Sequence, residues 1–128
     1  MHEKRVEIRW SDVDGYGHVN NAVYSTYLEE CRDEWLDGAL GDPEGSWDFV
    51  LARVAIDFRR ELRLEDDEVL VRCTLARIGT ASVTTTETIL AGGEVAAEAE
   101  AVLVARNRDR DGSRPLTEAE RAALERAG

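Results

Sequence analysis

The chain carries one long helical pattern, and only strand patterns follow it until the last residues. Within the helical pattern, apolar side chains recur at helical spacing and define a single stripe. The stripe consists of Tyr24, Tyr27, Leu28, Cys31 and Trp35. Asn20 is placed to cap the start of this helix, and Gly38 stands where a left-handed glycine ends one. The fold must therefore bury one face of one long helix.

Strand patterns lie on both sides of the helix. A first strand is expected over Glu3–Trp10, with Val6, Ile8 and Trp10 on one face. After the helix, one strand face is expected to hold Val50, Ala52, Val54, Ile56 and Phe58. Arg60 breaks this alternation, which indicates a bulge or a functional position. Three more strands are expected over Val69–Ile78, Ser82–Leu90 and Val95–Ala105.

Turn signals separate these elements. Gly92-Gly93 predicts a hairpin between the last two strands, and Pro43 and Gly45 mark Gly41–Ser46 as a loop. Arg106–Pro115 is polar and turn-like. Thr117 followed by Glu120 is a capping box, which predicts a short terminal helix over Glu118–Arg126.

Strands that follow one another without an intervening helix make a doubly wound α/β fold a poor match. The order predicts an α+β fold in which a five-stranded antiparallel sheet packs against one long helix, with a short C-terminal helix. A length of 128 residues fits one domain over positions 1–128.

Charge and composition exclude several classes of function. The net charge of −11 argues against nucleic acid and against an anionic membrane surface as partners. Apolar runs are far shorter than the roughly 20 residues that span a bilayer, and the start shows no signal-peptide pattern. Cys31 and Cys73 form no metal or redox motif and suit a reducing compartment as small core residues. These observations predict a soluble, cytoplasmic protein.

Most groups suited to chemistry lie in the loop before the helix. Asp12, Asp14 and His18 fall there among glycines, and two amides follow at the helix start. The first N–H groups of a helix can stabilise an oxyanion, and a nearby carboxylate can act as base or nucleophile. On spacing alone, turn and capping roles for the two aspartates are the better interpretation. The three side chains match no metal-ligand spacing, so no metal is expected.

The same loop carries a long pattern shared with a known family. The residues are Arg9-Trp10-x-Asp12-x-Asp14-x-x-Gly17-His18-Val19-Asn20-Asn21-x-x-Tyr24-x-x-Tyr27-x-Glu29-x-x-Arg32. This run resembles the signature of the 4-hydroxybenzoyl-CoA thioesterase branch of the hotdog superfamily. The resemblance continues more weakly over residues 50–105 and stops before Arg106. Glu61 departs from it, because many relatives have a proline there.

The resemblance implies a hotdog fold, with the sheet wrapped around the long helix and a homodimer or homotetramer whose site lies between subunits. Asp14 would be the catalytic residue, the backbone N–H of Asn21 the oxyanion donor, and His18 a group that shapes the site. Asp12 would be structural. Candidate substrate-binding residues are Gly17, Asn20, Tyr24, Arg59, Arg60 and Ser82. The two arginines are candidates for a CoA phosphate.

The implied reaction is hydrolysis of an acyl-CoA or acyl-carrier thioester without a cofactor. Asp14 would either attack the carbonyl or activate a water. No serine lies in a Gly-x-Ser-x-Gly elbow, and neither cysteine has a partner pattern for a nucleophile. Two alternatives remain: a hotdog protein that binds acyl-CoA without catalysis, and a hotdog hydratase or dehydratase. The acyl group is not specified by the sequence.

Overall fold

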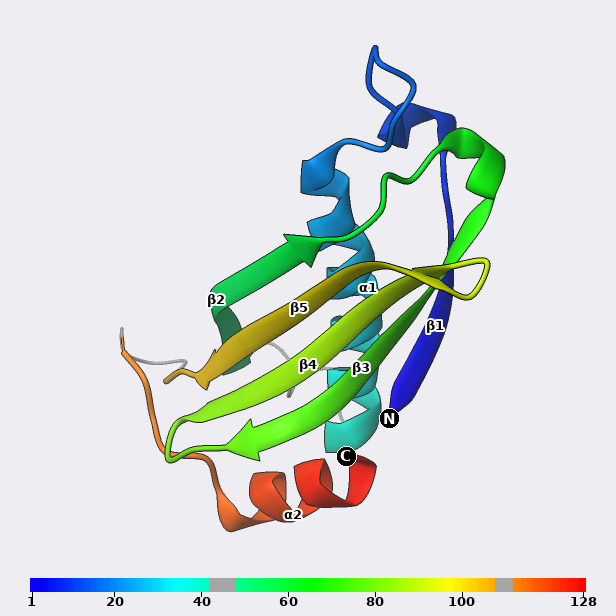
Figure 1. The fold of residues 1–128 in the computed structure, drawn as a ribbon. Helices are drawn as coiled ribbons and strands as arrows, with labels where there is room; N and C mark the ends of the chain where they lie inside the picture. The colour runs from blue at the N-terminus through cyan, green and yellow to red at the C-terminus, as the bar shows by residue number, and fades with distance from the viewer. Residues whose placement is uncertain (42–47, 108–111) are drawn as a thin grey trace.

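The computed structural model of the protein describes residues 1–41, 48–107 and 112–128. The elements are β1 (His2–Glu7), α1 (Asn21–Leu40), β2 (Phe49–Phe58), β3 (Glu68–Ile78), β4 (Ser82–Ala91), β5 (Glu94–Ala105) and α2 (Glu118–Ala127). The strands form one antiparallel five-stranded sheet in the order β1-β3-β4-β5-β2, which curves around α1 (Figure 1). The α+β prediction is confirmed. The predicted loop Gly41–Ser46 lies outside the described residues except for Gly41, as do residues 108–111 of the polar tail.

The core forms where the stripe of α1 meets the inner face of the sheet. Every residue of the predicted stripe is buried, and Tyr27, Leu28 and Cys31 are fully so. Across from them, β3 and β4 present buried side chains such as Val71 and Ile89. The hydrophobic pattern therefore determined correctly which face of the helix is covered.

The end of α1 differs from the prediction at Gly38. The helix runs on to Leu40, and the residue in the left-handed conformation is Gly41, with φ of 66°. Its N–H closes the last turn on the carbonyl of Asp37 at 3.1 Å. Gly38 is a helical residue, because a glycine inside a helix costs only about 1 kcal/mol and does not by itself end it.

The first strand is shorter than predicted. β1 ends at Glu7, and Trp10 begins a 3₁₀ turn in which it is 82% exposed. The carboxylate of Asp12 accepts the N–H of Arg9 at 3.0 Å, so the backbone turns there instead of continuing the ladder. Val6 and Ile8 are buried as expected, whereas the prediction for Trp10 was wrong.

A bulge in β2 changes which residues share a face. The pairing register with β5 shifts between Leu51 and Arg53, so Ala52 is the extra residue. Leu51 pairs with Leu103 and Val54 with Ala101, which places Leu51 on the inner face with Val54. The prediction that Val50 and Ala52 share that face was therefore wrong.

The strand then leaves the regular ladder where Arg60 broke the alternation. β2 ends at Phe58, and the N–H groups of Arg59 and Arg60 both donate to the carbonyl of Ala96, at 2.8 and 3.1 Å. Two further predictions are confirmed: Gly92 and Gly93 both have positive φ in the β4–β5 hairpin, and the Thr117 capping box starts α2.

The interior holds an ion pair that the sequence pattern did not indicate. Arg32 lies on α1 and donates from Nε and Nη2 to the Glu87 carboxylate on β4, at 2.8 and 2.9 Å. The side chains are 3% and 0% exposed. The hydroxyl of Thr85 also donates to Glu87, at 2.7 Å. A buried bidentate pair with a further donor leaves the carboxylate well satisfied.

Both cysteines are core residues, as predicted. Burial raises the pKa of the Cys31 thiol to about 12, with the nearby Glu87 carboxylate adding to the shift. The pKa of the Cys73 thiol is raised for the same two reasons. The two thiols are therefore poor nucleophiles in the folded protein. Across the described residues, no helix is both long and apolar enough to cross a membrane.

Candidate active site

The segment between β1 and α1 folds into a closed loop that projects from one end of the sheet (Figure 1). The N–H of Asp14 donates to the carbonyl of His18 at 2.8 Å, and Val13 and Val19 form an antiparallel bridge. The N–H of Asn20 returns to the carbonyl of Asp12 at 3.0 Å. These contacts fix the loop as it enters the helix.

Asp12 anchors the loop to the core. Its Oδ2 accepts the hydroxyl of Tyr27 at 2.7 Å and the N–H of Arg9 at 3.0 Å, and its side chain is 12% exposed. Burial, together with this hydrogen bond, raises the pKa of Tyr27 well above its ordinary value. These contacts all fall on Oδ2 and tie the loop to the core, and the structural role that the resemblance implied for Asp12 stays a prediction.

Asp14 is engaged through one oxygen only. Its Oδ1 accepts the N–H groups of Tyr16 and His18, at 2.9 and 3.3 Å. Its Oδ2 has no hydrogen-bond partner among the residues that the structure describes. The side chain is half-buried. The first oxygen therefore fixes the carboxylate while the second is free to act as base or nucleophile.

The first turn of α1 leaves one donor unused. Asn20 caps the helix as predicted, because its side chain accepts the N–H of Ala22 at 2.9 Å, and its carbonyl accepts the N–H of Val23 at 2.8 Å. Within residues 1–41, 48–107 and 112–128, the N–H of Asn21 donates to no protein acceptor. A free N–H at the positive end of a helix suits a developing oxyanion.

Two other loop residues have distinct settings. Gly17 is exposed and has φ of 85°, a conformation that favours glycine, and its N–H donates to the carbonyl of Asp14 at 3.2 Å. The imidazole Nε2 of His18 lies 3.1 Å from Oε2 of Glu61. Glu61 was not among the candidate site residues of the sequence. Its only signal in the sequence was that it departs from the family pattern.

The segment after β2 holds the loop from the side. The N–H of Val19 donates to the carbonyl of Leu62 at 2.7 Å. The hydroxyl of Tyr24 donates to the carbonyl of Arg60 at 2.9 Å and accepts the N–H of Leu62 at 3.0 Å. Tyr24 is 2% exposed and packs edge-on against Phe58, with ring centroids 5.0 Å apart. Within one chain, the buried Tyr24 side chain holds the segment after β2 in place. A contact between Tyr24 and substrate stays a prediction.

The structure places the remaining candidates farther from the loop or in other ion pairs. Arg60 contacts Asp66 at 3.0 Å and Glu94 at 3.2 Å, so a phosphate would have to displace carboxylates from it. Arg59 lies 3.4 Å from Glu98.

Ser82 is separated from the loop by the length of the sheet. It pairs with Val104, which is also the partner of Val50 at the start of β2, whereas the loop adjoins the other end of that strand. Within one chain, the fold does not bring Ser82 to Asp14.

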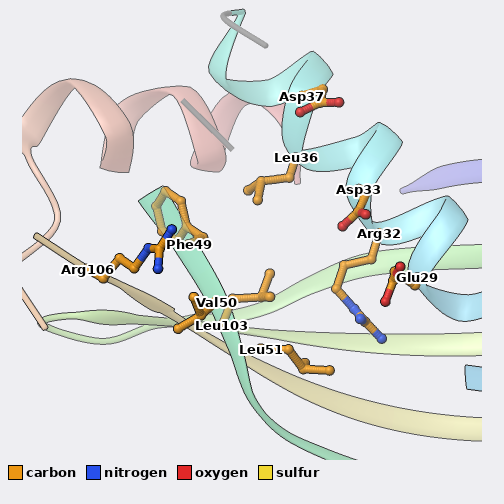
Figure 2. Close-up of a pocket in the computed structure, with 10 residues that line it drawn as sticks. All are labelled: Glu29, Arg32, Asp33, Leu36, Asp37, Phe49, Val50, Leu51, Leu103 and Arg106. Atoms are coloured by element: carbon orange, nitrogen blue, oxygen red, sulfur yellow. The ribbon is translucent and has the colours of Figure 1, made fainter. Parts of the chain in front are cut away.

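A groove runs between α1 and the inner face of β2 (Figure 2). It encloses about 560 Å³ and is lined by Glu29, Arg32, Asp33, Leu36, Asp37, Phe49, Val50, Leu51, Leu103 and Arg106. The helix contributes an acidic wall, and β2 contributes an apolar one. Burial, together with the charge of Glu29, raises the pKa of Asp33. On the same face of β2, Leu51, Val54 and Phe58 remain 44%, 37% and 45% exposed.

Comparisons with known proteins bear on this arrangement. The model of the thioesterase-like superfamily matches residues 8–124. A thioesterase from Thermus thermophilus, solved in complex with coenzyme A and Zn, is 34% identical with a TM-score of 0.90, over 98% of this chain and 92% of that one. A predicted thioesterase from Bacillus stearothermophilus is 28% identical with a TM-score of 0.90, over 98% and 94% of the two chains. The long-chain acyl-CoA thioesterase FadM of Escherichia coli (strain K12) is 34% identical over 70 residues, which are 50% of this chain and 51% of FadM. The match thus spans about half the length of that relative.

Proposed function

Because the chain belongs to the thioesterase-like superfamily, we propose that it hydrolyses the thioester bond of an acyl-CoA to a free acid and a thiol. The observation that carries the proposal is that two groups without a protein partner lie seven residues apart, one in the fixed loop and one at the start of α1 that the loop enters. Oδ2 of Asp14 is free to act on a carbonyl, and the N–H of Asn21 is free to hold the carbonyl oxygen. The Thermus relative that was solved with coenzyme A, and FadM, support the choice of an acyl-CoA.

The chemistry follows two routes that share these groups. In one, Oδ2 of Asp14 attacks the carbonyl carbon, the C–S bond breaks, and water hydrolyses the resulting anhydride. In the other, Asp14 removes a proton from water, the water oxygen attacks, the C–S bond breaks, and the proton passes to the leaving thiolate. In both, the N–H of Asn21 stabilises the negative charge that develops on the carbonyl oxygen.

The competing functions make different demands on the loop. A hotdog protein that only binds acyl-CoA needs no free carboxylate oxygen beside a helix N-terminus, so the state of Asp14 favours an enzyme. A hydratase or dehydratase needs an acid and a base across the acyl chain. Here the His18 ring contacts Glu61, and the hydrogen bonds between His18 and Asp14 are made by the backbone of His18. An acyl carrier protein is an alternative source of the thioester, although such carriers are acidic and this chain has a net charge of −11.

The test is thiol release by the purified protein from a panel of short-chain, long-chain and aromatic acyl-CoAs. Hydrolysis of one class above the uncatalysed rate supports the proposal and names the acyl group. Exchange between enoyl and hydroxyacyl esters without thiol release would identify a hydratase. Binding without any reaction would identify a carrier or sensor protein.

We also propose that the active form is a homodimer in which a second copy covers β2. As an edge strand of the sheet, β2 has unpaired backbone groups along its outer side. Its inner face leaves Leu51, Val54 and Phe58 partly exposed, and Leu51 also lines the groove of Figure 2. Apolar residues on an open strand edge are suited to pairing with the same strand of a second copy. Since Phe58 packs against Tyr24 at the start of α1, such an interface would reach the catalytic loop.

Replacement of Val54 by Arg should weaken the proposed dimer by about a hundredfold, because it places an unpaired charge in an apolar contact. Sedimentation equilibrium of the wild type and the variant measures this shift. Ala55→Arg is the matched control, because Ala55 lies on the opposite face of the strand, paired with Glu100. A monomeric wild type, or equal dissociation of both variants, would rule out this interface.

The two cysteines bear on the cellular compartment in which the protein acts. Two free, buried cysteines suit a reducing environment, and we propose that the protein acts in the cytoplasm.

A further inference from the structure

We infer that Glu61 is a positioning residue of the site, which acts by holding the imidazole of His18, a residue whose backbone is bonded to Asp14. The inference rests on the proposed thioester hydrolysis and adds a residue to it. Oε2 of Glu61 lies 3.1 Å from Nε2 of His18, although the two residues come from different segments of the chain.

The backbone of His18 is fixed to Asp14 independently of its ring. The N–H of His18 donates to Oδ1 of Asp14 at 3.3 Å, and its carbonyl accepts the N–H of Asp14 at 2.8 Å. Among the described residues, the one polar contact of the partly buried ring is with Glu61. With the main chain fixed, Glu61 is therefore the polar group that orients the imidazole.

The contact also decides which edge of the ring is available. With Nε2 turned toward the Glu61 carboxylate, Nδ1 is the ring nitrogen left for other partners. A ring nitrogen in the same loop as Asp14 can hold the hydrolytic water. The action of Glu61 therefore passes through His18, and Glu61 itself need not touch the substrate.

The position of Glu61 does not depend on its own side chain. The adjoining Leu62 is buried, and its carbonyl and N–H bond to Val19 and to the hydroxyl of Tyr24. Other charged groups near Glu61 are Arg63, whose Nη2 lies 3.6 Å from Oε2, and Arg60, whose Nη1 donates to the Glu61 carbonyl at 3.4 Å. Since the side chains of His18 and Glu61 are 32% and 62% exposed, the pair contributes little to folding, and variants at Glu61 should fold normally.

The experiment compares thiol release by Glu61→Ala and Glu61→Gln with that of the wild type. The Ala variant should lower kcat about tenfold with KM unchanged, because it frees a group that acts in the chemical step. The Gln variant keeps an oxygen that can accept from Nε2 and should restore most of kcat. Glu65→Ala is the matched control, because Glu65 is an exposed acid on the same segment and should leave kcat unchanged.

Double variants separate action through His18 from a general structural effect. In a His18→Ala background, Glu61→Ala should cause no further loss, because the group it positions is gone. An equal loss with and without His18, or no loss in the single variant, would overturn the inference.

The imidazole signals of the two histidines of the chain, His2 and His18, give a second readout in NMR spectra. Only the His18 signals should move in Glu61→Ala, whether or not the protein is active. If no acyl ester is hydrolysed by the wild type, the proposed function fails and this inference fails with it. Hydrolysis without a Glu61 effect removes the inference alone.

Discussion

Replacement of Asp14 by Asn should lower thiol release from the preferred acyl-CoA by about a thousandfold, while the fold remains intact. An amide oxygen at this position can still accept the N–H groups of Tyr16 and His18, so the loop keeps its shape. The amide has lost the negative charge with which Oδ2 attacks a carbonyl or removes a proton from water. The variant therefore isolates the chemistry from the structure.

The measurement is single-turnover and steady-state thiol release, with circular dichroism as a check on folding. Asp57→Asn is the matched control, because Asp57 is an exposed carboxylate on the outer face of β2 whose side chain lies 3.9 Å from Arg59. Its activity should equal that of the wild type. Unchanged activity of Asp14→Asn would remove Asp14 from the mechanism and leave the family assignment standing.

Replacement of Glu87 by Gln should lower the free energy of unfolding by about 3 kcal/mol, the largest stability effect that we expect from a single polar substitution. The substitution keeps the size of the side chain but leaves the buried Arg32 guanidinium without its counter-charge. Arg32 cannot escape to solvent without disturbing the helix, since its side chain is only 3% exposed.

Urea denaturation at a fixed protein concentration measures this change, and the fixed concentration keeps the contribution of oligomerisation the same for both proteins. Glu100→Gln is the control, because Glu100 forms a pair with Arg53 at 2.8 Å in which both side chains are more than half exposed. That variant should change stability by less than about 1 kcal/mol. Equal effects of the two substitutions would show that the buried pair has no special role.

The elements that could be predicted from the sequence are those fixed by local pattern. The stripe of α1, the Gly92-Gly93 hairpin and the capping box at Thr117 each depend on residues close together in the chain. The prediction was wrong where a local rule had to decide between two allowed outcomes. A glycine can stay inside a helix, as Gly38 does, and a strand can take up an extra residue, as β2 does at Ala52.

The candidate site also has a part that could be predicted from the sequence and a part that could not. Asp14, His18 and Asn21 lie in one contiguous motif, so their proximity follows from the sequence once the motif is noticed. The contacts of Glu61 with His18 and of Glu87 with Arg32 join residues far apart in the chain. No periodicity reports such a pair, because each partner alone is an ordinary charged residue. Only the register of the folded chain brings them together.

The strand order also bears on how the molecule folds. The β3–β4–β5 meander is built from neighbours in the chain, whereas β1 and β2 join opposite edges and pair with strands far along the chain. The loop that holds the candidate site depends on both of these edge strands. It follows β1 directly, the N–H of Ile8 bonds to Asp67 at 2.8 Å, and that of Val19 bonds to Leu62 beyond the end of β2. We therefore expect catalytic competence to be acquired last during folding and to be lost first on partial unfolding, before most of the sheet has melted.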